Sequence, residues 1–240
     1  MVTMTPGRMF TLLPRLDGRY VRLEPLQPWH AAGLAEAAAE DPSLYQLSAV
    51  PQGEAAAAEY IEAALAQRDA GTAAPFAVIR IADGAVIGST RFWDLAWWPW
   101  PQGHPRYRIT SEPRGAKAPR GRARSAIPPD VCEIGYTWLA RSAIRTAANT
   151  EMKRLMLGHA FEVWEVEAVC LHTDARNERS RRAMERIGAQ FEGILRAHRL
   201  ATDCLPRDSA RYSITAQEWP RCKRRLDEML APRGELAPQL

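Results

Sequence analysis

The 240-residue sequence predicts an α+β protein with a mixed, mostly antiparallel sheet, and three observations lead to this prediction. The first is a β-α-β unit made of an apolar run at 131–138, an amphipathic stretch at 150–164 and a second apolar run at 166–173. The two strands of such a unit lie parallel in one sheet. The second is Asp83-Gly84 between two short apolar runs, which indicates an antiparallel hairpin. The third is a content of 46% hydrophobic and 25% charged residues, which excludes disordered, collagen-like and membrane-bundle chains.

The other elements follow from periodicity and turn residues. Alternating or β-branched runs indicate strands, whereas an alanine-rich stretch or a 3.6-residue apolar stripe indicates a helix. In chain order these are strand 20–26, helix 28–40, helix 54–68, strands 76–81 and 85–92 and, after the β-α-β unit, helix 178–187, strands 191–195 and 210–214, and helix 218–230. We therefore expect one domain over 16–220, an N-terminal extension at 1–15, and a helix end and tail at 221–240.

The segment 94–129 carries most of the excess positive charge. It holds seven Lys and Arg against two acidic residues, whereas the whole chain has 32 against 28. Trp97, Trp98 and Trp100 lie among its prolines and glycines, and no regular period survives. We interpret it as an inserted loop. It is either a solvated basic loop anchored by tryptophans or a contact surface for an acidic acceptor, a nucleic acid, a ribosome or a partner subunit.

The cysteines and apolar runs indicate a reduced, cytoplasmic protein without membrane contact. The four cysteines are widely spaced and form no Cys-x-x-Cys pair, so we expect packing residues and no metal site. No apolar stretch has the length of a signal-peptide core or approaches the roughly 20 residues that span a bilayer.

Two strand-to-helix junctions carry polar residues that suit a ligand. The turn at 144–150 includes Arg145, and it leads into a helix whose free N–H groups attract phosphate. The second junction, 173–180, includes Asn177 and Ser180. Taken alone, each junction is better explained as a plain capped helix. Together they lie at the carboxyl ends of neighbouring strands, where ligands bind in such sheets.

The second junction also carries a family resemblance. Asn177-Glu178-Arg179-Ser180, followed by 183–187, Gly188-Ala189 and Glu192-Gly193, resembles the asparagine–serine helix motif of the GNAT superfamily of acyl-CoA-dependent N-acetyltransferases. The branch that it resembles contains the ribosomal-protein N-terminal (alanine) acetyltransferases. Supporting matches lie at 18–26, 133–136, 207–209 and 218–220. The resemblance implies the GNAT fold over about 16–220, outside the insertion, with acetyl-CoA as cosubstrate, an amine as acceptor and no metal.

The resemblance also implies which residues bind acetyl-CoA. These are the strand residues Tyr136, Thr137, Trp138 and Leu139 along the pantetheine arm, the turn residues Ile144, Arg145, Thr146, Ala147, Ala148, Asn149 and Thr150 around the pyrophosphate, and Asn177, Ser180 and Arg181 on the later helix. Asn177 would bond a pantetheine amide, and Ser180 would protonate the leaving thiol. The turn departs from the family pattern because Ala147 and Asn149 replace its glycines and Ile144 replaces its polar first residue.

For catalysis, the resemblance places Glu133 at an acidic strand position that relays a proton from the amine. An amine must lose its proton before it attacks a thioester, so a base is useful. The alternative for Glu133 is a salt-bridged strand carboxylate. His172 is expected to fill the core or a sheet edge, and His198 to lie on a hairpin near the acceptor. The sequence leaves open the acceptor amine, a homodimer, and a non-catalytic role as an acyl-CoA sensor or a ribosome- or RNA-associated adaptor.

Overall fold

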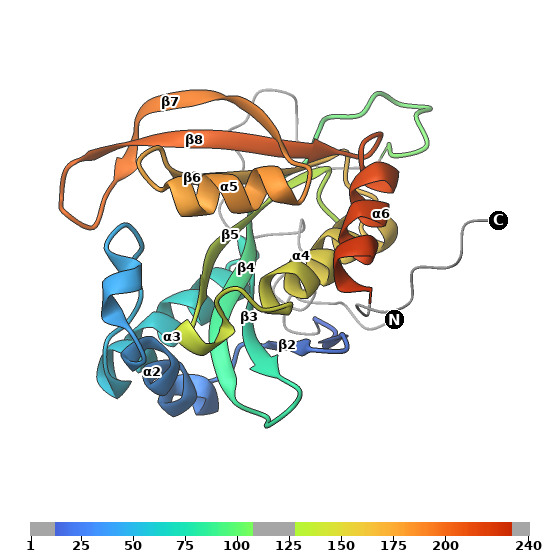
Figure 1. Cartoon of the computed structure of the whole chain (residues 1–240). Coiled ribbons are helices and arrows are strands. Elements are labelled where there is room, and N and C mark those ends of the chain that lie inside the picture. The colour runs from blue at the N-terminus through green and yellow to red at the C-terminus, as the bar shows by residue number, and fades with distance from the viewer. Residues whose placement is uncertain (1–12, 108–127, 232–240) are drawn as a thin grey trace, which may run out of the picture.

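Eight strands form one twisted sheet in the computed structural model, which describes residues 13–107 and 128–231 (Figure 1). The order across the sheet is β1 (Leu16–Asp17), β2 (Val21–Pro25), β3 (Ala73–Arg80), β4 (Val86–Ala96), β5 (Val131–Leu139), β6 (Ala168–Asp174), β8 (Pro206–Thr215) and β7 (Gln190–Leu200). The pair β5–β6 is parallel and the other pairs are antiparallel. The predicted fold class, the parallel β-α-β step and the hairpin at Asp83-Gly84 are therefore confirmed.

The helices hold the two halves of the sheet together. They are η1 (Pro28–His30), α2 (Ala31–Ala39), η2 (Pro42–Tyr45), α3 (Glu54–Asp69), η3 (Arg141–Ala143), α4 (Ala148–Gly158) with its π-helical end η4 (His159–Val163), α5 (Glu178–Arg186) and α6 (Trp219–Leu230). Helices α2 and α3 pack on each other and on β4 and β3, whereas α4 packs on α6 and reaches β1 and β2 (Figure 1). Helix α5 contacts β6, so its first turn lies beside the parallel pair.

The core lies between these helices and the sheet. Phe76, Phe92, Met152 and Met156 are fully buried on facing elements. One polar contact also crosses this core. The buried carboxylate of Glu151 accepts hydrogen bonds from three consecutive backbone N–H groups at residues 19–21. It therefore fixes the start of α4 to the start of β2.

Several elements are longer than the sequence predicted. Strand β4 continues to Ala96, because Ala96 still pairs with Val131, so the loop begins three residues later than expected. Strand β7 continues beyond 195 to Leu200, and β8 begins at Pro206. Charged residues interrupt the apolar alternation in both extensions, so periodicity does not predict them. Cross-strand pairing nevertheless holds these residues in a hairpin. The helix expected at 28–40 starts as a 3-10 turn, and the helix expected at 150 starts at Ala148.

The first part of the insertion is folded against Asp130, the residue directly before β5. Trp98 N and Trp100 Nε1 donate to the two carboxylate oxygens of Asp130 at 2.6 and 2.8 Å. Trp100 stacks on His104 with ring centroids 4.1 Å apart, and Arg106 lies 3.7 Å from Asp130. The rest of the insertion, 108–127, lies outside the described residues, as do 1–12 of the extension and 232–240 of the tail.

The described residues contain no helix with both the length and the apolar character needed to cross a bilayer. All four cysteines are free; Cys132, Cys170 and Cys222 are buried, whereas Cys204 is exposed. Residues 13–107 and 128–231 contain no cluster of three or more His, Cys, Asp or Glu side chains arranged to hold a metal ion.

Candidate functional site

The parallel strands β5 and β6 separate halfway along their length. Their pairing covers only Val131↔Ala168, Cys132↔Val169 and Glu133↔Cys170. Beyond Glu133, β5 stays paired with β4 and β6 stays paired with β8. A V-shaped opening results, and within the described residues no strand pairs with the β6-facing edge of β5 from Ile134 onward. Its backbone polar groups are available to an extended ligand.

A β-bulge at Tyr136 widens the opening. Ser89 pairs with Trp138, whereas Arg91 pairs with Gly135, so β5 holds one extra residue between these pairs. Tyr136 takes a positive φ of 51°, which is unfavourable for a non-glycine residue. Its ring is held by the Arg91 guanidinium 4.0 Å above it and by Trp93 in an edge contact at 5.0 Å. The buried Arg91 and the partly buried Trp93 therefore support the strained conformation.

The N-terminus of α4 faces the same opening. Arg145 takes the left-handed conformation, with φ of 63°, and Thr146 Oγ1 accepts a hydrogen bond from Ala148 N. Ala147 has helical angles, φ −67° and ψ −15°, at the N-cap position. The turn therefore needs positive φ at Arg145 and not at Ala147, so alanine is compatible with the backbone where the family has glycine.

Asn177 caps the first turn of α5. Its Oδ1 accepts a hydrogen bond from Ser180 N at 3.0 Å. The cap uses the carbonyl oxygen of the side chain, so the Nδ2 amide group remains able to donate to a ligand carbonyl. Ser180 and Asn177 both line the opening.

Most of the predicted site residues line one cavity of about 830 Å³. Of the predicted residues, its lining includes Glu133, Tyr136, Thr137, Trp138, Leu139, Ile144, Arg145, Thr146, Asn149, Asn177 and Ser180. Ala147, Ala148, Thr150 and Arg181 are not part of the lining. Thr150 is buried and bonded to Arg186, and Arg181 donates to Tyr212 Oη and lies over the Phe191 ring. Arg181 is therefore engaged away from the cavity, because a helix turns successive side chains to different faces.

Glu133 stands at the point where the strands separate and is only 3% exposed. Its Oε2 lies 2.8 Å from His172 Nδ1 and 3.8 Å from Arg199 Nη2, a guanidinium nitrogen. The His172 ring in turn lies 5.2 Å from that of His198, whose pKa is lowered by burial and by Arg199. A buried carboxylate and an imidazole in contact form a unit that can accept a proton and pass it on.

Lys153 lies beneath β5 and lines the same cavity. Its Nζ donates to Thr137 Oγ1 at 3.0 Å, and Thr137 Oγ1 lies 2.8 Å from Thr90 Oγ1. Burial lowers the pKa of Lys153 to about 7, although the Glu133 charge acts in the opposite direction. The floor of the opening thus holds an amine that titrates near neutral pH.

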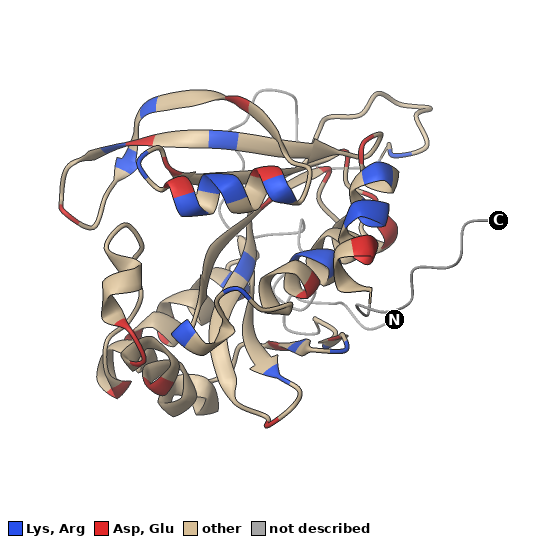
Figure 2. Cartoon of the chain, in the orientation of Figure 1, with Lys and Arg blue, Asp and Glu red and all other residues tan. Residues whose placement is uncertain are grey.

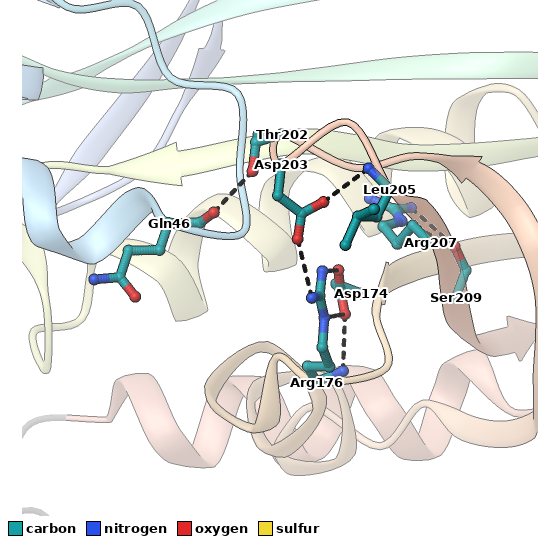
Figure 3. A network of polar contacts seen from close by, with 8 residues as sticks. All are labelled: Gln46, Asp174, Arg176, Thr202, Asp203, Leu205, Arg207 and Ser209. Atoms are coloured by element: carbon teal, nitrogen blue, oxygen red, sulfur yellow. Dashed lines mark hydrogen bonds and ion pairs between the residues drawn. The ribbon is translucent and has the colours of Figure 1, made fainter.

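Three contacts hold η2 and the β7–β8 hairpin beside the cavity, and Figure 3 draws the first two. Thr202 Oγ1, near the hairpin tip, donates to the Gln46 carbonyl at 2.8 Å. Arg176, before α5, bonds both Asp174 and Asp203. From the other side, Tyr45 Oη donates to the Leu139 carbonyl at 3.0 Å. The hairpin and η2 therefore flank the opening that the parallel strands leave.

Sequence reasoning missed His172, Lys153, Arg199 and Arg207 as parts of this site. His172 was expected to fill the core or an edge, but it contacts Glu133. The parallel register offered a signal: Glu133 pairs with Cys170, so His172, two residues on, projects from the same face. Lys153 follows Asn149 by one helical turn, which also predicts a common face. The two arginines gave no signal, since the hairpin that holds them was not predicted at its full length.

Comparison with known proteins agrees with the family that the Asn177–Ser180 motif resembles. Residues 21–190 match a family described as the acetyltransferase (GNAT) domain. A Bacillus subtilis relative named "Putative ribosomal N-acetyltransferase YdaF" is 34% identical over 87 residues, which are 36% of this chain and 46% of the relative. The match to this curated relative thus spans about half of its length.

Two solved structures share the fold. A GCN5-related N-acetyltransferase from Brucella melitensis superposes with a TM-score of 0.70 at 28% identity, over 94% of this chain and 90% of that one. Mycobacterium smegmatis RimJ, solved with CoA-disulfide, has a TM-score of 0.68 at 19% identity, over 94% and 97% of the two chains. The second likeness concerns the fold alone.

Proposed function

Because this chain belongs to the GNAT acetyltransferase family, we propose that it transfers an acetyl group from acetyl-CoA to a primary amine in a ternary complex. The membership confirms the family resemblance of the Asn177–Ser180 motif and the expected fold. The observation that carries the proposal is the joining of the β5–β6 opening, the α4 N-terminus and the Asn177 cap in a single cavity.

The residues present suit acetyl-CoA. The unpaired edge of β5 offers backbone groups to the pantetheine amides, as does Asn177 through Nδ2. The start of α4, with Arg145 beside it, offers free N–H groups and the positive end of the helix dipole to the pyrophosphate. Ala147 has helical angles, which supports retention of this phosphate site without the family's glycines.

The chemistry then falls to residues at the strand separation. Glu133 takes a proton from the acceptor amine, directly or through water, and His172 in contact with it shares the positive charge that arrives. The neutral amine attacks the thioester carbonyl, and its nitrogen becomes cationic. As the C–S bond breaks, Ser180 passes a proton to the departing thiolate and is reprotonated by that nitrogen, which leaves the neutral amide. Backbone N–H groups of β5 polarise the carbonyl.

The acceptor we propose is a protein N-terminus or a small-molecule amine. The name of the Bacillus subtilis relative supports a protein acceptor, but that match covers only part of each chain. The rival function is a non-catalytic acyl-CoA sensor or a ribosome- or RNA-associated adaptor. It would use the same cavity for acyl-CoA and the basic insertion for its partner.

The deciding experiment measures release of the CoA thiol from acetyl-CoA with a panel of amines and N-terminal peptides. We expect release that depends on the acceptor, with the acetyl group found on that amine by mass spectrometry. Binding of acetyl-CoA without release for any acceptor would favour the sensor. The Glu133→Gln variant serves as control, because it should bind acetyl-CoA as the wild type does while turning over slowly.

A further inference from the structure

Two arginines face each other at the end of the cavity beside Glu133. Arg199 of β7 and Arg207 of β8 are direct cross-strand partners, and both line the cavity. Like charges opposite each other on neighbouring strands destabilise a sheet unless an anion lies between them. Figure 2 shows that basic residues, interrupted by acidic ones, also recur along the nearby helix α5.

Neither arginine has a carboxylate of its own within hydrogen-bonding distance among the described residues. The nearest to Arg199 is Glu133, at 3.8 Å, while the guanidinium lies 4.0 Å over the Trp93 ring. Arg207 donates through Nε and Nη2 to Ser209 Oγ, a neutral acceptor (Figure 3). Burial, and secondarily the Arg199 charge, lower the pKa of Arg207.

The neighbouring Arg176 shows what a fully paired arginine looks like here. It donates to Asp174 at 2.8 to 3.0 Å and to Asp203 at 3.1 Å (Figure 3). The charges of Asp174 and Glu133 both raise the pKa of Arg207. The carboxylate oxygens of Asp174, however, already accept hydrogen bonds from Arg176. The facing arginines therefore have unused donor capacity toward the cavity.

We infer that the acceptor carries a carboxylate close to its amine, and that Arg199 and Arg207 bind this carboxylate while Glu133 receives the amine. This inference rests on the proposed function and narrows its acceptor class. Arginine donates through a planar fork that matches a carboxylate, and the two forks come from facing positions. The anion can belong to an acidic residue near a peptide N-terminus or to a small amino acid, and the test distinguishes these sources.

The arginines lie apart from the proposed phosphate site. Arg199 borders Glu133 and Trp93 and Arg207 is its cross-strand partner, whereas the phosphate site is the turn at Arg145 and Thr146 before α4. Removing Arg207 should therefore change the preference for the acceptor and leave the affinity for acetyl-CoA unaltered. A variant that lost acetyl-CoA binding instead would overturn the assignment.

The test compares acceptors that differ only in one charge. Peptides beginning Ala-Glu, Ala-Gln and Ala-Lys, together with free glutamate and its α-amide, are assayed with wild type and Arg207→Gln. We expect wild-type kcat/KM about 10- to 100-fold higher for the acidic member of one peptide or small-molecule pair, the range that one charged hydrogen-bonding group supports. The pair that shows the preference identifies the source of the carboxylate.

Variants then separate recognition from folding. Arg207→Gln should abolish the acidic preference by lowering kcat/KM for the acidic acceptor much more than for the neutral one, and Arg207→Glu should shift the preference to Ala-Lys. Arg196→Gln is the matched control, because Arg196 is exposed on the same hairpin outside the cavity. Transfer with equal kcat/KM for acidic and neutral acceptors would overturn this inference alone. Failure of transfer to every acceptor would overturn the proposed function, and this inference with it.

Discussion

Replacing Glu151 tests how the helix that bears the proposed phosphate site is held in place. The Glu151 carboxylate is 6% exposed and accepts hydrogen bonds from Arg19 N, Tyr20 N and Val21 N at 2.7, 2.6 and 2.7 Å. It lies in the first turn of α4, where the helix dipole also favours a negative charge. One side chain thus satisfies three backbone donors of the turn before β2, in contacts that are buried at Val21 and partly buried at Arg19 and Tyr20.

The Glu151→Gln variant keeps the shape but replaces one oxygen by an NH2 group. That group faces N–H donors, so one or two of the three donors lose their acceptor. A buried donor without a partner costs about 1–3 kcal/mol, so we expect the free energy of unfolding to fall by about 2–5 kcal/mol. For a chain of this size each kcal/mol lowers Tm by about 2–4 °C, which gives a decrease of about 4–20 °C.

Thermal and urea unfolding, followed by circular dichroism, measure this change. Glu59→Gln is the matched control, because Glu59 is an exposed glutamate on α3. A Tm for Glu151→Gln equal to that of the control would refute the reasoning, because the three contacts would then contribute nothing net.

Three further predictions concern the cavity. Glu133→Gln should lower kcat by about 10²- to 10⁴-fold, the usual contribution of general base catalysis, with acetyl-CoA affinity unaltered; unchanged turnover would remove Glu133 from the mechanism. Asn177→Asp keeps the oxygen that caps Ser180 N but removes the amide donor. We therefore expect an unchanged Tm and a lower affinity for CoA, measured by calorimetry. A fall in Tm as large as the loss of CoA affinity would mean that Asn177 is only a cap. Because burial lowers the pKa of Lys153 to about 7, the unfolded chain binds more protons above that pH, and wild-type stability rises with pH from about 7 to 10.5. Lys153→Met should therefore stabilise the fold more near pH 6 than near pH 9, by up to about 3 kcal/mol for the two pH units above 7 at 1.36 kcal/mol per unit; an equal gain at both would contradict the burial argument.

Local patterns predicted the elements that carry strong periodicity or clear caps. The two strands of the β-α-β unit, the Asp83-Gly84 hairpin and the Asn177 cap all appear where the sequence placed them. The ends of β4 and β7 were not predicted, because the residues there are charged or aromatic and are held by pairing with a distant strand. Arg181, expected at the cofactor, is instead engaged by Tyr212, a contact between residues far apart in the chain.

The sequence alone determined the fold class, the place of the two strand-to-helix junctions proposed to bind acetyl-CoA and, through the Asn177–Ser180 motif, the family. These features depend on short-range order, in which a few adjacent residues set a turn, a cap or a helix start. Only the tertiary structure decided what surrounds Glu133. The separation of β5 from β6 and the long β7–β8 hairpin bring His172, Lys153, Arg199 and Arg207 to that carboxylate or to its cavity. Such neighbours arise from strand register and burial, which no local pattern of one element records.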